Sequence, residues 1–117
     1  MATVLVVDDD ADVLDAVVEV LLWEGFAVQR ARGGEAALRL LHAGPLPDLV
    51  LLDARMDKVD GTAVSRLIRA EPATREIPIV FMSADRRFRP PEGMPLLDKP
   101  FAVAELLDLV RATVQRQ

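Results

Sequence analysis

The chain has 117 residues, of which 51% are hydrophobic and 4% aromatic, and its formal net charge is −5. This length suits a single domain, and the negative charge argues against general binding of nucleic acids, which needs a basic face. The absence of cysteine excludes disulfides and thiolate metal sites.

The start of the chain lacks the basic segment and long apolar stretch of a signal peptide. No apolar run is long enough to span a bilayer. We therefore expect a cytoplasmic protein that does not bind a membrane.

Short apolar runs alternate along the chain with segments of helical periodicity. Apolar runs bounded by turn residues predict buried strands, and apolar residues spaced three or four apart predict helices with one inward face. In chain order, the predicted elements are a strand at 3–7, a helix at 11–23, a strand at 26–31, a helix at 35–43, a strand at 49–52, a helix at 62–70, a strand at 79–82, a short strand at 96–97 and a helix at 102–116. The predicted inward residues of the four helices are Leu14, Val17, Val18 and Leu21, then Leu38 and Leu41, then Val64, Leu67 and Ile68, and lastly Val103, Leu106, Val110 and Val114.

Strands that alternate with helices indicate an α/β fold with a parallel sheet. Uninterrupted apolar strands fit a sheet that is covered on both faces. In such a sheet, ligands bind beyond the carboxyl ends of the strands, where the strand order reverses. If the order is 2-1-3-4-5, which we assume from known doubly wound folds, that point lies between the first and third strands.

Acidic side chains fall at this predicted point. Asp8, Asp9 and Asp10 directly follow the first strand, and Asp53 follows the third. Carboxylates gathered at one place resist ionising beside each other. A hard cation relieves this repulsion, and an all-oxygen site with space for waters suits Mg²⁺.

Two further polar residues end strands at the same edge of the sheet. Lys99 follows the fifth strand, and its compact cation on a flexible stem suits an anionic phosphoryl group. Ser83 follows the fourth strand and offers a hydroxyl for a phosphoryl oxygen. Together with Asp53, these residues predict a phosphoryl-transfer site in which the carboxylate is the nucleophile.

More ordinary roles are expected for some neighbouring residues. Asp10 or Asp12 is expected to cap the first helix, because aspartate is favoured there, while Asp8 and Asp9 face the site. Trp23 is expected to be partly buried packing at the end of that helix, with a contact to a partner protein as the alternative.

Five segments in order resemble the receiver domain of two-component response regulators, and the resemblance covers the whole chain. They are VVDDD at 6–10, DLVLLD at 48–53, MDKVDG at 56–61, FMSA at 81–84 and DKPF at 98–101. Each segment alone is a weak signal, but five in order with family-like spacing are specific. The resemblance implies one receiver domain over 1–117, with a flavodoxin-like, doubly wound (βα)5 fold and a five-stranded parallel sheet in the order 2-1-3-4-5.

The resemblance also implies the function. Asp53 is expected to accept a phosphoryl group from a phosphohistidine of a sensor histidine kinase or histidine phosphotransfer protein. The phosphorylated state is expected to alter contacts with an unknown downstream protein. Asp9 is expected to bind Mg²⁺ directly, with Asp8 assisting through water and Asp53 and the backbone carbonyl of Arg55 as further ligands. The chain is then not a conventional enzyme, because it promotes only its own phosphorylation and dephosphorylation.

The phosphoryl oxygens have their own expected partners by the same resemblance. Lys99 and Ser83 are expected to hold these oxygens, and the backbone N–H of Ala84 adds a further hydrogen bond. The bond between Lys99 and Pro100 is expected to be cis, which proline makes accessible.

Three features depart from the family pattern. Asp57 stands where members usually carry proline, which should loosen the loop and add negative charge. Only fifteen residues separate Ser83 from Lys99, so the family's fourth helix is expected to shrink to about one turn near 85–88, or to be lost. Leu96 replaces the usual Tyr or Phe, so we expect no activated dimer through the face that the family forms from its fourth helix, fifth strand and last helix.

Two other functions are weighed against this one. A degenerate receiver would act as a phosphorylation-independent adaptor. The complete set of site residues argues against this alternative. The altered face near the fifth strand, through which members of the family signal, leaves the alternative possible. A Mg²⁺-dependent phosphatase with an aspartyl-phosphate intermediate is disfavoured. Such enzymes place the nucleophile after the first strand in an Asp-x-Asp pattern and carry a cap domain.

Overall fold

The computed structural model describes residues 1–115, in which strands and helices alternate. The elements are β1 (Thr3–Val7), α1 (Ala11–Trp23), β2 (Ala27–Ala31), α2 (Gly34–Ala43), β3 (Leu49–Asp53), α3 (Gly61–Ala70), β4 (Ile79–Ser83), a 3₁₀ turn (Pro91–Gly93), β5 (Leu96–Asp98) and α4 (Val103–Val114). Residue 116, the predicted end of the last helix, lies outside the described residues. None of the described helices is long and apolar enough to cross a membrane.

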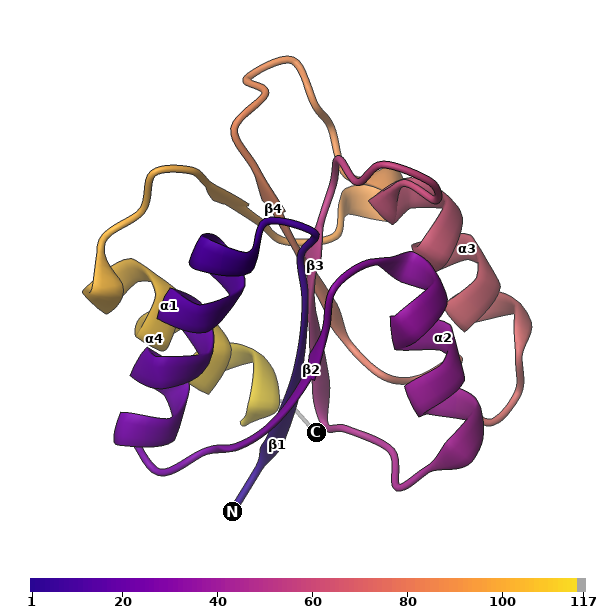
Figure 1. Cartoon of the computed structure of the whole chain (residues 1–117), viewed down its shortest axis with the longest axis horizontal. Coiled ribbons are helices and arrows are strands. Elements are labelled where there is room, and N and C mark those ends of the chain that lie inside the picture. The colour runs from indigo at the N-terminus through magenta and orange to yellow at the C-terminus, as the bar shows by residue number, and fades with distance from the viewer. Residues whose placement is uncertain (116–117) are drawn as a thin grey trace.

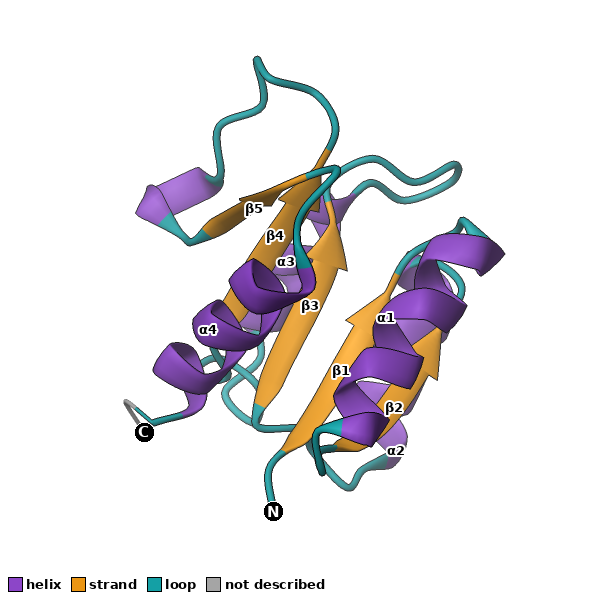
Figure 2. Ribbon diagram, turned by 90° about the vertical axis from the view of Figure 1, so that its left-hand side faces the viewer, coloured by secondary structure: helices purple, strands orange, loops and turns teal. Residues whose placement is uncertain are grey.

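Five parallel strands form one sheet in the order β2-β1-β3-β4-β5, which confirms the predicted topology. Figure 1 shows α1 and α4 on one face and α2 and α3 on the other, and Figure 2 shows the strands side by side. Val4 and Val6 of β1 join the core under α1 and α4, whereas Leu5 and Val7 join the core under α2 and α3. Both strand faces are therefore buried, which explains the uninterrupted apolar runs.

Helix α1 begins at an aspartate cap beside the edge of the sheet where the strands end. The side chain of Asp10 accepts hydrogen bonds from the backbone N–H groups of Asp12 and Val13, at 2.9 and 3.3 Å. The predicted cap is thus Asp10 and not Asp12. Gly25 follows the helix with a φ of 93°, a conformation that favours glycine.

Several helix faces differ from the periodicity prediction. Leu67 and Val103 were predicted to face inward but are 49% and 54% exposed, and Trp23 is 89% exposed, so it is not partly buried packing. Ser65 is buried in α3, and its hydroxyl donates to the carbonyl of Thr62 at 2.8 Å. That bond satisfies the buried hydroxyl, so a polar residue can take an inward position in α3.

No α-helix separates β4 from β5 in the described part of the chain, which confirms the expected loss of the family's fourth helix. A single turn at 85–88 is closed by the N–H of Phe88, which donates to the carbonyl of Asp85 at 3.1 Å. The ring of Phe88 lies 5.2 Å from the ring of buried Phe81 in β4, at an interplanar angle of 52°. This aromatic contact covers part of the sheet face that the missing helix would cover.

Candidate functional site

Three carboxylates meet where β1 and β3 end. Asp8 follows β1 and is fully buried, Asp53 ends β3 and is 6% exposed, and Asp9 is half-buried. Each offers an oxygen within 4.8 Å of the others. The strand order predicted this convergence, because β1 and β3 are neighbours whose carboxyl ends share one edge. A cleft of about 460 Å³ opens there, lined by Asp8, Asp9, Asp10, Asp53, Arg55, Ala84, Asp85 and Lys99.

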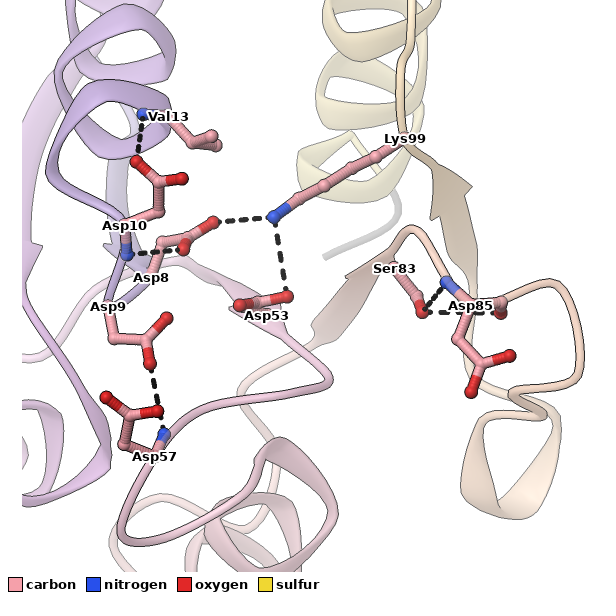
Figure 3. A network of polar contacts seen from close by, with 9 residues as sticks. All are labelled: Asp8, Asp9, Asp10, Val13, Asp53, Asp57, Ser83, Asp85 and Lys99. Atoms are coloured by element: carbon pink, nitrogen blue, oxygen red, sulfur yellow. Dashed lines mark hydrogen bonds and ion pairs between the residues drawn. The ribbon is translucent and has the colours of Figure 1, made fainter.

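Lys99 reaches into this cluster from the end of β5 (Figure 3). Its Nζ lies 2.8 Å from Oδ2 of Asp8 and 3.4 Å from Oδ1 of Asp53. Its backbone N–H donates to the carbonyl of Ser83 at 2.8 Å, and the following bond to Pro100 is cis. Burial disfavours the ammonium, but the hydrogen bond to Asp8 and the charges of Asp53 and Asp8 outweigh it and raise the pKa of Lys99.

The pKa of Asp53 is raised to about 6. Burial is the largest cause, the charge of Lys99 opposes it, and the negative charge of Asp8 adds to it. The backbone N–H of Arg55 also favours the ionised carboxylate and lowers the pKa of Asp53 slightly. With a pKa of about 6, Asp53 is mostly ionised near pH 7, and Lys99 offsets part of the cost of burying its charge.

The carboxylates of Asp8 and Asp9 are held in place by backbone donors. Oδ1 of Asp8 accepts the N–H of Asp10 at 3.0 Å, and Oδ2 of Asp9 accepts the N–H of Asp57 at 3.0 Å. A proline in place of Asp57 would have no N–H to donate. This departure from the family pattern therefore supplies a bond that ties the β3–α3 loop to Asp9.

The oxygen atoms that could bind a metal here suit a hard divalent cation. Asp8, Asp9 and Asp53 supply oxygens only, which is the ligand type that Mg²⁺ prefers. Three carboxylates beside the single ammonium of Lys99 leave about two negative charges when all are ionised. A dication would neutralise them, so the residues present fit the predicted metal.

Ser83 ends β4 and is 2% exposed. Its hydroxyl oxygen accepts the N–H of Asp85 at 3.0 Å and lies 3.4 Å from the carbonyl of Asp85. Figure 3 shows Ser83 beside Asp85 and apart from Asp53. Ser83 is thus at the predicted edge of the sheet, while its hydroxyl bonds to its own loop.

An ion pair that the sequence analysis missed borders the cleft. A guanidinium nitrogen of Arg55, after β3, lies 2.5 Å from a carboxylate oxygen of Asp85, after β4. The N–H of Arg87 donates to the other oxygen of Asp85, and this bond, followed by the charges of Arg55 and Arg87, lowers the pKa of Asp85. The opposite charges at these strand ends could have suggested the pair, but its geometry depends on the path of two loops.

Comparisons with known proteins agree with this geometry. The model of the response regulator receiver domain matches residues 4–111. Response regulator MprA of Mycolicibacterium vanbaalenii is 36% identical over 97% of this chain and 50% of that protein. The crystal structure of response regulator TrrA from Thermotoga maritima in complex with Mg²⁺ and BeF has a TM-score of 0.86 and 29% identity, covering 97% of this chain and 99% of that one.

A third comparison concerns the fold alone. Chemotaxis protein CheY4 of Vibrio cholerae superposes with a TM-score of 0.86 at 24% identity, over 97% of this chain and 98% of that chain. The chain spans about half the length of the curated relatives it matches. It therefore belongs to the response regulator receiver domain family, whose members accept a phosphoryl group in two-component signalling and catalyse only this transfer to themselves.

Proposed function

We propose that Asp53 is the residue that takes the phosphoryl group, and that the donor is a phosphohistidine of a sensor histidine kinase or histidine phosphotransfer protein. The observation that carries the proposal is the meeting of a buried carboxylate with two further carboxylates and one ammonium at the ends of three strands. In the transfer, an oxygen of Asp53 bonds to phosphorus as the nitrogen–phosphorus bond breaks. The bonding electrons return to the imidazole, which takes up a proton.

Mg²⁺ is the proposed cofactor. Asp9 and Asp53 would bind it directly, Asp8 would assist through water, and the backbone carbonyl of Arg55 would be a further ligand. Bound there, the ion would neutralise charge on the phosphoryl oxygens during transfer. The Mg²⁺ in the related TrrA structure supports this choice.

Lys99, Ser83 and the N–H of Ala84 are the proposed partners of the phosphoryl oxygens. Lys99 already contacts Asp53, and Ala84 lines the same cleft. For Ser83 the proposal requires a change of partner, because its hydroxyl now accepts the N–H of Asp85. The downstream target is proposed to be another protein, reached in the cytoplasm without direct binding of nucleic acid by residues 1–117.

The intact mass of the protein after incubation with phosphoramidate tests the acceptor. Phosphoramidate carries the same type of nitrogen–phosphorus bond as phosphohistidine. We expect the wild type to gain one phosphoryl group only with Mg²⁺, and Asp53→Asn to gain none. The matched control is Asp108→Asn, the same change at an exposed position of α4, which should gain the group normally.

Two results would contradict the proposal. A phosphoryl group on Asp53→Asn would place the acceptor elsewhere. A folded wild type that gains no group, from phosphoramidate or from a histidine kinase, would favour the phosphorylation-independent adaptor. Release of inorganic phosphate from a phosphomonoester would instead favour the phosphatase, although Asp53 ends β3 and does not follow β1.

A further inference from the structure

The loop between β3 and α3 directs one backbone donor at a residue of the candidate metal site. The N–H of Asp57 donates to Oδ2 of Asp9 at 3.0 Å, and the two residues are 48 positions apart in the chain. This is the one hydrogen bond that the carboxylate of Asp9 makes among the described residues, and Asp9 takes part in no ion pair there. Asp8, by contrast, accepts the N–H of Asp10 and contacts Lys99. Asp9 is therefore held by fewer polar contacts than Asp8, and the loop supplies the one that it has.

The donor lies in a loop that is anchored on both sides. Met56, which precedes Asp57, is buried in the core under α2 and α3. Further along, Asp60 caps α3 by accepting the N–H of Ala63 at 3.0 Å. These anchors restrict the path of the backbone at Asp57, although its own side chain is exposed. The N–H of Asp57 is thus presented from a defined position.

The bond leaves Asp9 able to bind a cation. In Figure 3, one oxygen of Asp9 faces the N–H of Asp57, and the other lies on the side of Asp53. Asp9 offers an oxygen within 4.8 Å of oxygens of Asp8 and Asp53. A donor that holds a metal ligand in place orients that ligand and raises the affinity for the metal. The N–H of Asp57 can therefore act on a metal through Asp9, without contacting the metal itself.

We propose that the backbone N–H of Asp57 is a positioning group that holds Asp9 ready to bind Mg²⁺, an inference that rests on the proposed function. The side chain of Asp9 then loses less conformational freedom when the metal binds. The bond also couples the metal to the loop. If the ordered loop favours the metal, the metal favours the ordered loop by the same factor.

This role belongs to the chain and not to the family pattern. By the resemblance to the family, members usually carry proline where Asp57 stands, and proline has no N–H to donate. The same resemblance indicates that the backbone of this loop accommodates proline. Asp57→Pro should therefore remove the bond and leave the fold intact.

The exposed carboxylate of Asp57 is a second way in which this residue could act on a cation. Figure 3 shows this carboxylate beside Asp9. Its charge would attract a cation at longer range, but water and salt screen an exposed charge. Asp57→Ala removes the carboxylate and keeps the N–H, whereas Asp57→Pro removes both. The two variants therefore separate the hydrogen bond from the charge.

Titration of the isotope-labelled protein with Mg²⁺, followed by NMR of its backbone amides, measures metal affinity without phosphorylation. We expect Asp57→Pro to bind Mg²⁺ about tenfold more weakly than the wild type. Asp57→Ala should keep most of the affinity. Lys58→Pro is the matched control and should also keep most of it, because the N–H of Lys58 makes no hydrogen bond among the described residues. The amide spectra show whether each variant is folded.

Hydrogen exchange supplies a readout that needs neither metal nor proline. In metal-free buffer, Asp9→Ala should speed the exchange of the Asp57 N–H with water by about tenfold, because one hydrogen bond protects it. Exchange of the Lys58 N–H should change much less. In the wild type, Mg²⁺ should slow the exchange of the Asp57 N–H, as the reciprocal coupling requires.

Each contrary result has its own meaning. Equal Mg²⁺ affinity of Asp57→Pro and the wild type would overturn the inference and leave the metal site standing, as would an equal loss in Lys58→Pro. An equal loss in Asp57→Ala and Asp57→Pro would overturn it in favour of the carboxylate. Unchanged exchange of Asp57 in Asp9→Ala, or no slowing by bound Mg²⁺, would overturn it whether or not Asp57→Pro folds. A wild type that binds no Mg²⁺ would instead overturn the proposed cofactor, and this role of Asp57 with it.

Discussion

The fold places the carboxyl group of Asp53 in surroundings that favour its protonated form more than water does in the unfolded chain. Burial, helped by the charge of Asp8 and opposed by Lys99, raises its pKa from 3.8 to about 6. Between these two values, the folded protein binds a proton that the unfolded chain has already lost. Stability therefore falls as the pH rises through this window, by up to about 3 kcal/mol from this group.

Asp53→Asn should remove much of the destabilisation that comes from burying an ionised carboxylate. In metal-free buffer with a chelator at pH 7.5, we expect the free energy of unfolding of the variant to exceed that of the wild type by about 1 to 2 kcal/mol. The gain is smaller than the full cost because Lys99 loses one of its two partners. Urea unfolding at several pH values measures it, and the difference should vanish toward pH 4. A difference independent of pH would contradict this account of Asp53.

The positions of the site residues could be predicted only where they follow from the sheet. Asp8, Asp9, Asp53 and Lys99 lie at or just after the ends of strands, and parallel strands bring these ends together. The partner of Ser83 could not be predicted in this way. It depends on the path of the loop after β4, which follows no repeating pattern, and the ion pair of Arg55 was missed for the same reason.

At the scale of the elements, α3 begins in close contact with the backbone at the end of β3. A Cβ atom on Gly61 would lie 2.3 Å from the carbonyl oxygen of Asp53 and 2.9 Å from Cα of Ala54. The N–H of Gly61 also donates to the carbonyl of Ala54 at 3.0 Å. The start of α3 is therefore packed directly against the end of β3, beside Asp53.

Gly61→Ala should push the two elements apart. We expect a loss of about 1 to 3 kcal/mol in the free energy of unfolding, as for other overpacked sites, and slower phosphorylation of Asp53. Thermal unfolding and the rate of mass gain with phosphoramidate measure the two effects. Thr62→Ala, one residue further along the helix, is the control, and equal behaviour of the two variants would argue against this contact.

Helical periodicity predicted which segments form helices better than which apolar residues are buried. A periodic pattern gives the direction of a face, but the width of the covered arc depends on the neighbouring elements. Leu67 and Val103 lie beyond that arc and are exposed, while Leu107 is buried. The loss of the helix between β4 and β5 was predictable, because the segment is short and the adjacent residues Pro90 and Pro91 cannot continue a helix.

At the scale of the whole molecule, the face beside β5 lacks parts that many receivers use in activated dimers. The segment between β4 and β5 forms no α-helix. By the resemblance to the family, Leu96 stands where members usually carry an aromatic residue. We therefore expect the protein to remain monomeric with Mg²⁺ and beryllofluoride, which stands in for the phosphoryl group. Light scattering after size-exclusion chromatography measures this. A dimer that Leu96→Arg abolishes would show the prediction to be wrong.

The segment between β4 and β5 has a consequence for proteolysis. The ring contact between Phe88 and Phe81, the turn at 85–88 and the partly exposed ion pair of Arg55 with Asp85 are among the contacts that hold it, and opening it costs less than unfolding the sheet. Arg86 and Arg87 place two trypsin-sensitive bonds in this stretch, which is the orange loop at the top of Figure 1. A ligand in the cleft that draws Arg55 away from Asp85 would free the loop for cutting. The rate of tryptic cleavage would then report occupancy of the cleft without any label.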